Sequence, residues 1–184
     1  MITTMLRNQF VIRPVKLSTI TGQFAGLKHT LRFHNLVAEY LPEEKEKMMA
    51  RAIEDGLERG GVEVIVLPLK SSNRSVVATE LLEAGALLVG SPTINNNIFP
   101  SVADVLTYMR GLKPANLVGA AFGSFGWSGE GARQVNDFLA GMKVDVVAEA
   151  LNLQFRPDAE GIEKCRELGA AVAARLKEVI ENGA

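Results

Sequence analysis

Cysteine is nearly absent from this sequence, which has only Cys165 among its 184 residues. An intramolecular disulfide is therefore excluded, and nothing in the cysteine content indicates an oxidising compartment. An excess of charge of one sign is lacking too, since 20 basic and 21 acidic side chains give a net charge of -1. That balance disfavours a nucleic-acid or anionic-membrane surface. No apolar run approaches the ~20 residues of a membrane span, and residues 1–10 lack a secretory hydrophobic region, so we expect a cytoplasmic protein.

Histidine is also scarce, and neither His29 nor His34 has cysteine or carboxylate neighbours at metal-ligand spacing. The sequence therefore predicts no metal site. Cys165 lies between Ile162 and Leu168 on the apolar face of a helix expected over about residues 158–180. This position indicates a core side chain rather than a reactive thiol.

Helical and strand patterns alternate along the chain from about residue 43. Short apolar runs predict buried strands at 62–68, 86–90, 116–123 and 144–150. Between and after them, apolar residues at helical spacing predict helices within 42–61, 71–85, 101–112, 131–142 and 158–180. Ser101 and Asp104 stand at capping-box spacing at the start of one of these helices. The alternation predicts an α/β fold with a parallel sheet covered by helices on both faces.

Two unusual segments follow strands of this predicted sheet, SPTINNNIFP (91–100) and FGSFGWSGEG (122–131). In a parallel α/β sheet, ligands lie at the carboxyl ends of the strands. Glycine lets a backbone approach another molecule, Trp127 offers a planar face, and three asparagines offer hydrogen-bond donors and acceptors. Tight turns use the same residue types, because asparagine tolerates left-handed conformations. Two such segments at one edge of the sheet favour a planar polar ligand.

The stretches VGSPTINNNIFPSVADVLTYMRGLKP (89–114) and VGAAFGSFGWSGEGARQVNDFLAGM (118–142) resemble the flavodoxin-like domain of the flavodiiron proteins, also called A-type flavoproteins. The resemblance runs from about Glu46 to Leu176. It implies a doubly wound, flavodoxin-like parallel sheet of five strands in the order 2-1-3-4-5. It also implies that FMN binds at the strand ends, with 91–97 flanking one side of the isoalloxazine ring and 124–130 wrapping its other edge.

The residues that the resemblance implies as FMN contacts come from these two segments. They are Ser91, Pro92, Thr93, Ile94, Asn95, Asn96 and Asn97 in the first, and Ser124, Phe125, Gly126, Trp127, Ser128 and Gly129 in the second. The implied function is electron transfer, in which the cofactor carries the chemistry and no catalytic side chain is required. The implied partners are a rubredoxin-like protein, a flavin reductase or a diiron protein, and the family also tends to form homodimers.

One departure from the family concerns iron. Flavodiiron proteins carry diiron ligands in an H-x-E-x-D-H pattern, which these 184 residues lack. We therefore expect neither oxygen reduction to water nor nitric oxide reduction by this chain alone. Two alternatives to an electron-transfer domain stay open at this point. One is an FMN-dependent quinone or nitro reductase, and the other is a flavin-free remnant that acts as an interaction module.

The second departure lies at the N-terminus. The family places a strand and a Thr/Ser-rich phosphate loop before the first helix. Here the helix itself begins near Pro42, and Glu43, Glu44 and Glu46 at its start would repel a phosphate. STITGQ (18–23) faintly matches such a loop and offers Thr19 and Thr21 as phosphate ligands. We therefore divide the chain into an atypical segment, 1–45, and a flavodoxin-like domain, 46–184. A central strand must come from residues 9–40; LVAEY (36–40) is a candidate, although Glu39 stands where a buried residue belongs.

Overall fold

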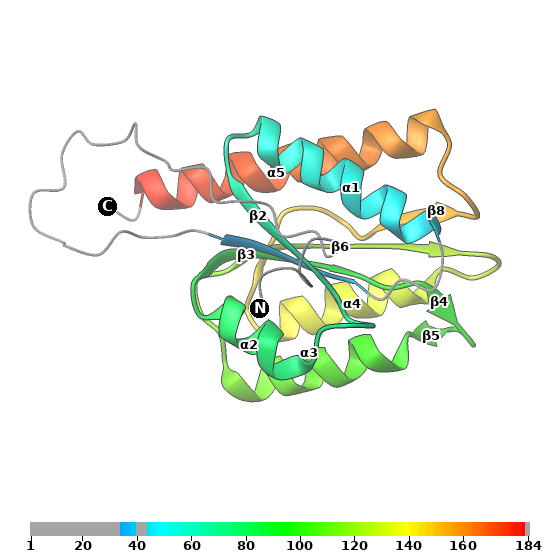
Figure 1. The fold of residues 1–184 in the computed structure, drawn as a ribbon, viewed down its shortest axis with the longest axis horizontal. Helices are drawn as coiled ribbons and strands as arrows, with labels where there is room; N and C mark the ends of the chain where they lie inside the picture. The colour runs from blue at the N-terminus through cyan, green and yellow to red at the C-terminus, as the bar shows by residue number, and fades with distance from the viewer. Residues whose placement is uncertain (1–33, 40–43, 183–184) are drawn as a thin grey trace, which may run out of the picture.

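The fold is built on one parallel sheet with helices on both faces, seen in a computed structural model that describes residues 34–39 and 44–182 (Figure 1). Within these described ranges six strands form the sheet, in the order β2-β1-β3-β6-β7, with β8 also pairing with β6. All five strand pairs are parallel. The strands are β1 (His34–Glu39), β2 (Glu63–Pro68), β3 (Ala84–Gly90), β6 (Val118–Phe125), β7 (Asp145–Val146) and β8 (Leu151–Gln154).

Among the described residues, five helices form the two outer layers. They are α1 (Glu44–Arg59), α2 (Arg74–Leu81), α3 (Pro100–Leu112), α4 (Glu130–Gly141) and α5 (Ala159–Asn182). Helices α1 and α5 lie side by side over one face of the sheet, and α2, α3 and α4 cover the other (Figure 1). The predicted doubly wound, flavodoxin-like α/β fold is confirmed. In the part of the chain that the structure describes, the sheet has six strands rather than the five expected, because β7 and β8 both pair with β6.

Strand β3 shows how the sheet supports two separate cores. Ala86 and Leu88 join the core under α1 and α5, whereas Leu87 and Val89 join the core under α2, α3 and α4. Because neighbouring residues of a strand point to opposite faces, a strand buried on both sides must be apolar throughout. This is why the run ALLVG could be predicted as a strand from its sequence.

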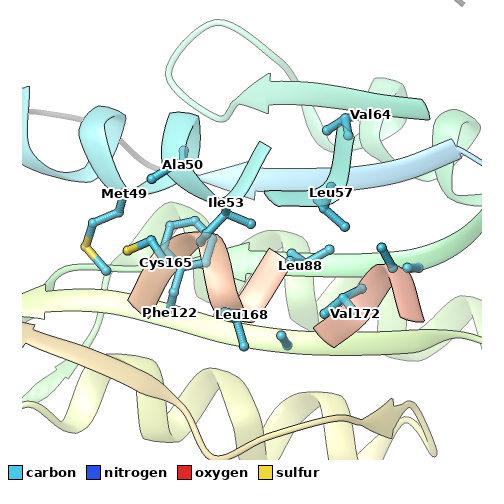
Figure 2. Packing of buried hydrophobic residues seen from close by; sticks show 14 of the residues in the cluster. Met49, Ala50, Ile53, Leu57, Val64, Leu88, Phe122, Cys165, Leu168 and Val172 are labelled. Atoms are coloured by element: carbon cyan, nitrogen blue, oxygen red, sulfur yellow. The ribbon is translucent and has the colours of Figure 1, made fainter. Parts of the chain in front are cut away.

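The core under α1 and α5 closes through side chains of the first and last helices (Figure 2). Ile53 of α1 and Cys165 of α5 are both fully buried there, over Phe122 of the sheet. The predicted core position of Cys165 is confirmed. Two glycines bring the helices close together, since a side chain on Gly56 or Gly169 would collide with the backbone of the opposite helix.

The central position of the sheet is filled by β1. This strand pairs with β2 on one side and β3 on the other, which confirms that a segment within residues 9–40 occupies the slot. Glu39 is the last residue of β1, opposite Pro68 and Gly90, so it ends the strand rather than interrupting it. The sheet thus draws on residues before 46, and the predicted domain division stays a prediction.

Two local predictions were wrong. The strand predicted at 144–150 covers only β7, and the chain forms a second strand, β8, in the half-polar sequence LNLQ. The predicted capping box of α3 does not form, because Pro100 starts the helix one residue earlier and Phe99 is its N-cap. The Asp104 carboxylate instead accepts a hydrogen bond of 2.9 Å from Arg74.

Candidate functional site

The two unusual segments lie together at the carboxyl-terminal edge of the sheet, next to the end of β8 (Figure 1). The first forms a hairpin, residues 93–98, made of β4 (Thr93–Ile94) and β5 (Asn97–Ile98). The second ends β6 and continues into a glycine loop, residues 126–129, before α4 begins. The structure therefore brings together the thirteen residues that the resemblance implied, at the edge where parallel sheets hold ligands.

Asn95 and Asn96 form the turn of the hairpin. Their φ angles are 48° and 59°, which is the left-handed region required at both central residues of a type I′ turn. Asparagine adopts this conformation at lower cost than most residues. Asn97 supports the turn by donating from Nδ2 to the Asn95 carbonyl at 2.8 Å. At least two of the three asparagines thus have a conformational role. This agrees with the alternative interpretation, in which the asparagines form a tight turn rather than only face a ligand.

Ser91 fixes the start of the hairpin segment from inside the protein. Its side chain is buried, and Oγ accepts a hydrogen bond of 3.0 Å from the Phe99 backbone N–H. Oγ also donates to the Pro92 carbonyl at 2.9 Å. These contacts close residues 91–99 into a compact unit. The Ser91 hydroxyl therefore already donates and accepts a hydrogen bond within the protein.

Protein packing explains most of the glycines that suggested a close ligand. A side chain on Gly123 would collide with the Ser91 backbone carbonyl. A Cβ on Gly131 would lie 2.9 Å from Pro92 O and 3.0 Å from Thr93 Oγ1. Gly129 has a φ of 76° and is the N-cap of α4. At Gly126, by contrast, the nearest atom to an added Cβ is a ring carbon of Phe155, 3.9 Å away.

Hydrogen bonds join the hairpin to the segment that contains the glycine loop. The Gly131 backbone N–H donates to Thr93 Oγ1 at 3.0 Å, which ties the base of the hairpin to the start of α4. Ser128 Oγ lies 3.0 Å from Asn96 Oδ1, which ties the hairpin turn to the loop. The two segments therefore form one surface instead of two independent loops.

Strand β8 holds the glycine loop from its other side. Asn152 Nδ2 donates to the Gly129 carbonyl and Gln154 Nε2 donates to the Gly126 carbonyl, each at 3.0 Å. The Phe155 backbone N–H donates to the Phe125 carbonyl at 2.8 Å. Sequence reasoning missed both amide side chains. The polar positions alternating with leucine in LNLQ were the signal that could have revealed an edge strand with one polar row.

These contacts leave a defined set of donors at the loop surface. Among the described residues, the backbone N–H groups of Gly126, Trp127 and Ser128 donate to no protein acceptor. The Trp127 side chain beside them is 94% exposed, and Phe155 is 56% exposed. Free N–H donors next to an exposed aromatic face fit a flat ring that carries carbonyl acceptors, as the isoalloxazine of a flavin does.

Glu130 adds a negative charge at the end of the glycine loop. A hydrogen bond from the Ser128 side chain lowers the pKa of this carboxyl, and the Glu130 backbone N–H and the nearby Arg133 lower it further. The Ser128 hydroxyl has one proton and also lies near Asn96, so it can donate to only one of the two at a time. Ser128 thus links the charge of Glu130 to the hairpin turn.

Other predicted features fall elsewhere. Thr19 and Thr21 lie outside the described residues, and they precede β1, whereas a loop between β1 and α1 must follow it. Only residues 40–43, Tyr-Leu-Pro-Glu, connect these two elements.

Within the part of the chain that the structure describes, no cluster of three or more potential metal-ligating His, Cys, Asp or Glu residues occurs. None of the helices described there is long and apolar enough to cross a membrane.

Comparisons of sequence and of structure both relate this chain to flavodoxin-like proteins. The flavodoxin family model matches residues 45–169. A nitric oxide reductase from Moorella thermoacetica is 44% identical over 129 residues, which cover 70% of this chain and 32% of that protein. A flavodiiron protein from Giardia intestinalis superposes with a TM-score of 0.77 at 31% identity, covering 83% of this chain and 38% of the other.

A single-domain structure matches over its full length. A flavodoxin from the domain Archaea superposes with a TM-score of 0.72 at 28% identity, covering 79% of this chain and 99% of the other. By contrast, the chain spans about a third of the length of the first curated relatives that it matches. The similarity to those longer proteins is therefore confined to one of their parts.

Proposed function

Since this chain belongs to the flavodoxin family and is homologous to the flavodoxin-like part of the flavodiiron proteins, we propose that it binds FMN at the hairpin and glycine loop and transfers electrons. Flavodoxins bind FMN and transfer electrons. The observation that carries the proposal is the row of backbone donors at Gly126, Trp127 and Ser128, which stand beside an exposed aromatic side chain.

The roles of the residues follow from their chemistry. The N–H groups of the glycine loop would donate to the ring carbonyls, and the hairpin would flank one side of the ring. Trp127 packs against the ring and shields it from water, which strengthens the hydrogen bonds there. Bound FMN supplies one- and two-electron redox chemistry, so no side chain of the protein has to act as acid, base or nucleophile.

The phosphate of FMN is a separate question from the ring. The connection between β1 and α1 contains no serine, threonine or glycine, and α1 begins with Glu44. Hydroxyl and backbone donors at a helix N-terminus are the usual phosphate ligands. The fit to FMN therefore rests on the ring, and affinity for riboflavin close to that for FMN is expected if no other residues hold the phosphate.

Electron exchange with other proteins is part of the proposal. A rubredoxin-like protein, a flavin reductase or a diiron protein would suit, as the family resemblance implies, and the homodimer stays a prediction. Exposed Trp127 and Phe155 mark the edge at which such a partner would approach the ring.

The test is a visible absorption spectrum of the purified protein, followed by titration of the apo-protein with FMN. We expect flavin absorption and saturable binding, with no steady-state NAD(P)H turnover in the presence of quinones or nitro compounds. Such turnover would favour a self-sufficient reductase. Absence of flavin binding at saturating FMN would refute the proposal and leave an interaction module.

A further inference from the structure

Gln134 of α4 contacts the hairpin through both ends of its side-chain amide. Its Oε1 accepts a hydrogen bond of 2.9 Å from the Ile98 backbone N–H. Its Nε2 lies 3.3 Å from the Asn96 carbonyl oxygen and 3.3 Å from Asn97 Oδ1. A primary amide has one carbonyl and two N–H donors, so these contacts use all three groups. One side chain thus holds both the turn and the returning strand of the hairpin.

The other attachments of the hairpin do not duplicate this contact. Thr93 ties its base to Gly131, at the opposite end from the turn. Ser128 reaches the turn through Asn96, but that contact is exposed, and Glu130 competes for its proton. Gln134 is half-buried and makes the contacts that anchor the turn to a rigid helix. Groups placed on regular elements are held more precisely than groups on loops.

We propose that Gln134 is a positioning residue: it fixes the hairpin turn in the position beside the glycine loop that the flavin ring requires. It thereby sets the affinity for the ring and its reduction potential. This inference rests on the proposed function, because it takes the ring to lie against both the hairpin and the glycine loop. A shift of the hairpin changes the hydrogen bonds and dipoles around the ring, and these tune the electronics of a bound cofactor.

Gln134 lies outside both hydrophobic cores, whereas its neighbour Val135 is fully buried. Replacing Gln134 by leucine therefore removes the hairpin contacts and leaves the core side chains in place. Asp137 is one helical turn along α4, is exposed, and forms no hydrogen bond or ion pair with the hairpin among the described residues, so Asp137→Leu is the matched control. Gln134→Met keeps an unbranched side chain without its hydrogen-bonding groups and serves as a second variant if Gln134→Leu does not fold.

The experiment compares these variants with the full wild-type chain in three measurements. They are thermal unfolding of the apo-protein, dissociation constants for FMN and for lumiflavin, and the midpoint potential of the bound flavin. We expect Gln134→Leu to fold, to bind both ligands about tenfold more weakly, as loss of one typical hydrogen bond implies, and to shift the midpoint potential. Lumiflavin carries only the ring, so an equal loss for both ligands locates the effect at the ring.

Hydrogen exchange of the Ile98 amide tests whether Gln134 holds the hairpin, separately from whether the hairpin sets flavin affinity and potential. Gln134 accepts a hydrogen bond from this amide and should protect it from exchange in the apo-protein. Faster exchange in Gln134→Leu, with unchanged flavin affinity and potential, would overturn the positioning role. An equal effect of Asp137→Leu on flavin binding would overturn it too. If wild-type protein binds no flavin, the proposed function fails and the positioning role fails with it, while the Ile98 amide still reports whether Gln134 holds the hairpin.

Discussion

Replacing Gly131 by alanine has two opposing effects: it raises helix propensity, and it creates a steric clash with the base of the hairpin. Gly131 is the second residue of α4, where alanine is a better helix former than glycine by at most about 1 kcal/mol. The added Cβ, however, would lie 2.9 Å from Pro92 O, 3.0 Å from Thr93 Oγ1 and 3.1 Å from Thr93 Cα. All three atoms belong to the start of the hairpin, so the hairpin must move to admit the methyl group.

The size of the effect follows from these distances. Carbon and oxygen atoms reach ordinary contact at about 3.5 Å, so the base of the hairpin has to shift by roughly half an ångström. Overpacking of this kind costs about 1–3 kcal/mol, which exceeds the gain in propensity. The free energy of unfolding should therefore fall by about 0–2 kcal/mol. FMN affinity should fall as well, because the displaced residues belong to the proposed ring site.

Urea unfolding of the apo-protein and FMN titration measure the two effects. Gly141→Ala at the other end of α4 is the control, since an added Cβ there meets nothing within 4 Å. That variant should gain up to about 1 kcal/mol in stability and keep its FMN affinity. Equal stabilisation by both alanines, with unchanged FMN affinity, would refute the role assigned to the contact between Gly131 and the hairpin.

Three further predictions concern single side chains. Trp127→Ala should weaken FMN binding by about 0.5–1.5 kcal/mol and leave thermal unfolding unchanged, because the side chain is 94% exposed; equal affinity in a flavin titration would contradict ring contact. Burial raises the pKa of Glu54 from 4.5 to about 7, helped by Glu58 and opposed by Arg51. The folded state then binds more protons than the unfolded state between these two pH values. The free energy of unfolding should therefore fall by up to about 3 kcal/mol as the pH rises from about 4.5 to 7, and level off above. Urea unfolding from pH 4 to 8 measures this slope, and Glu54→Gln should flatten it. Burial also raises the pKa of Cys165 to about 12, so iodoacetamide at pH 8 should label it only in unfolded protein, and rapid labelling of the native state, detected by mass spectrometry, would contradict its core position.

Much of the fold could be predicted because its strands are buried on both faces. The runs that became β2, β3 and β6 are short and almost wholly apolar, which fits a parallel sheet between helices. β8 was missed because Asn152 and Gln154 alternate with leucines in an edge strand, and even these leucines are only partly buried. The capping box failed because Pro100 fixes the first turn of α3 independently of Ser101.

The meeting of the two candidate segments at one edge of the sheet could be predicted, but the contacts between them could not. Residues 91–97 and 124–129 were placed at one edge by their position after two parallel strands. The amides that hold them, Gln134, Asn152 and Gln154, act over 23 to 38 residues of sequence. No local pattern encodes a hydrogen bond of that range. The three consecutive asparagines fitted either a tight turn or a ligand-binding segment, so the sequence alone did not predict the turn of the hairpin.

The pairing of α1 with α5 has a consequence for biosynthesis. Asp55 of α1 bonds to Arg166 of α5 at 2.8 Å, across 111 residues of sequence. At a synthesis rate of about 5–20 residues per second, the apolar face of α1 leaves the ribosome roughly 6–22 s before its covering helix exists. The opposite layer, α2 to α4, is complete within a shorter stretch of chain and can fold first. During that interval the apolar face of α1 lacks its covering helix, so α1 is the segment that a chaperone would meet.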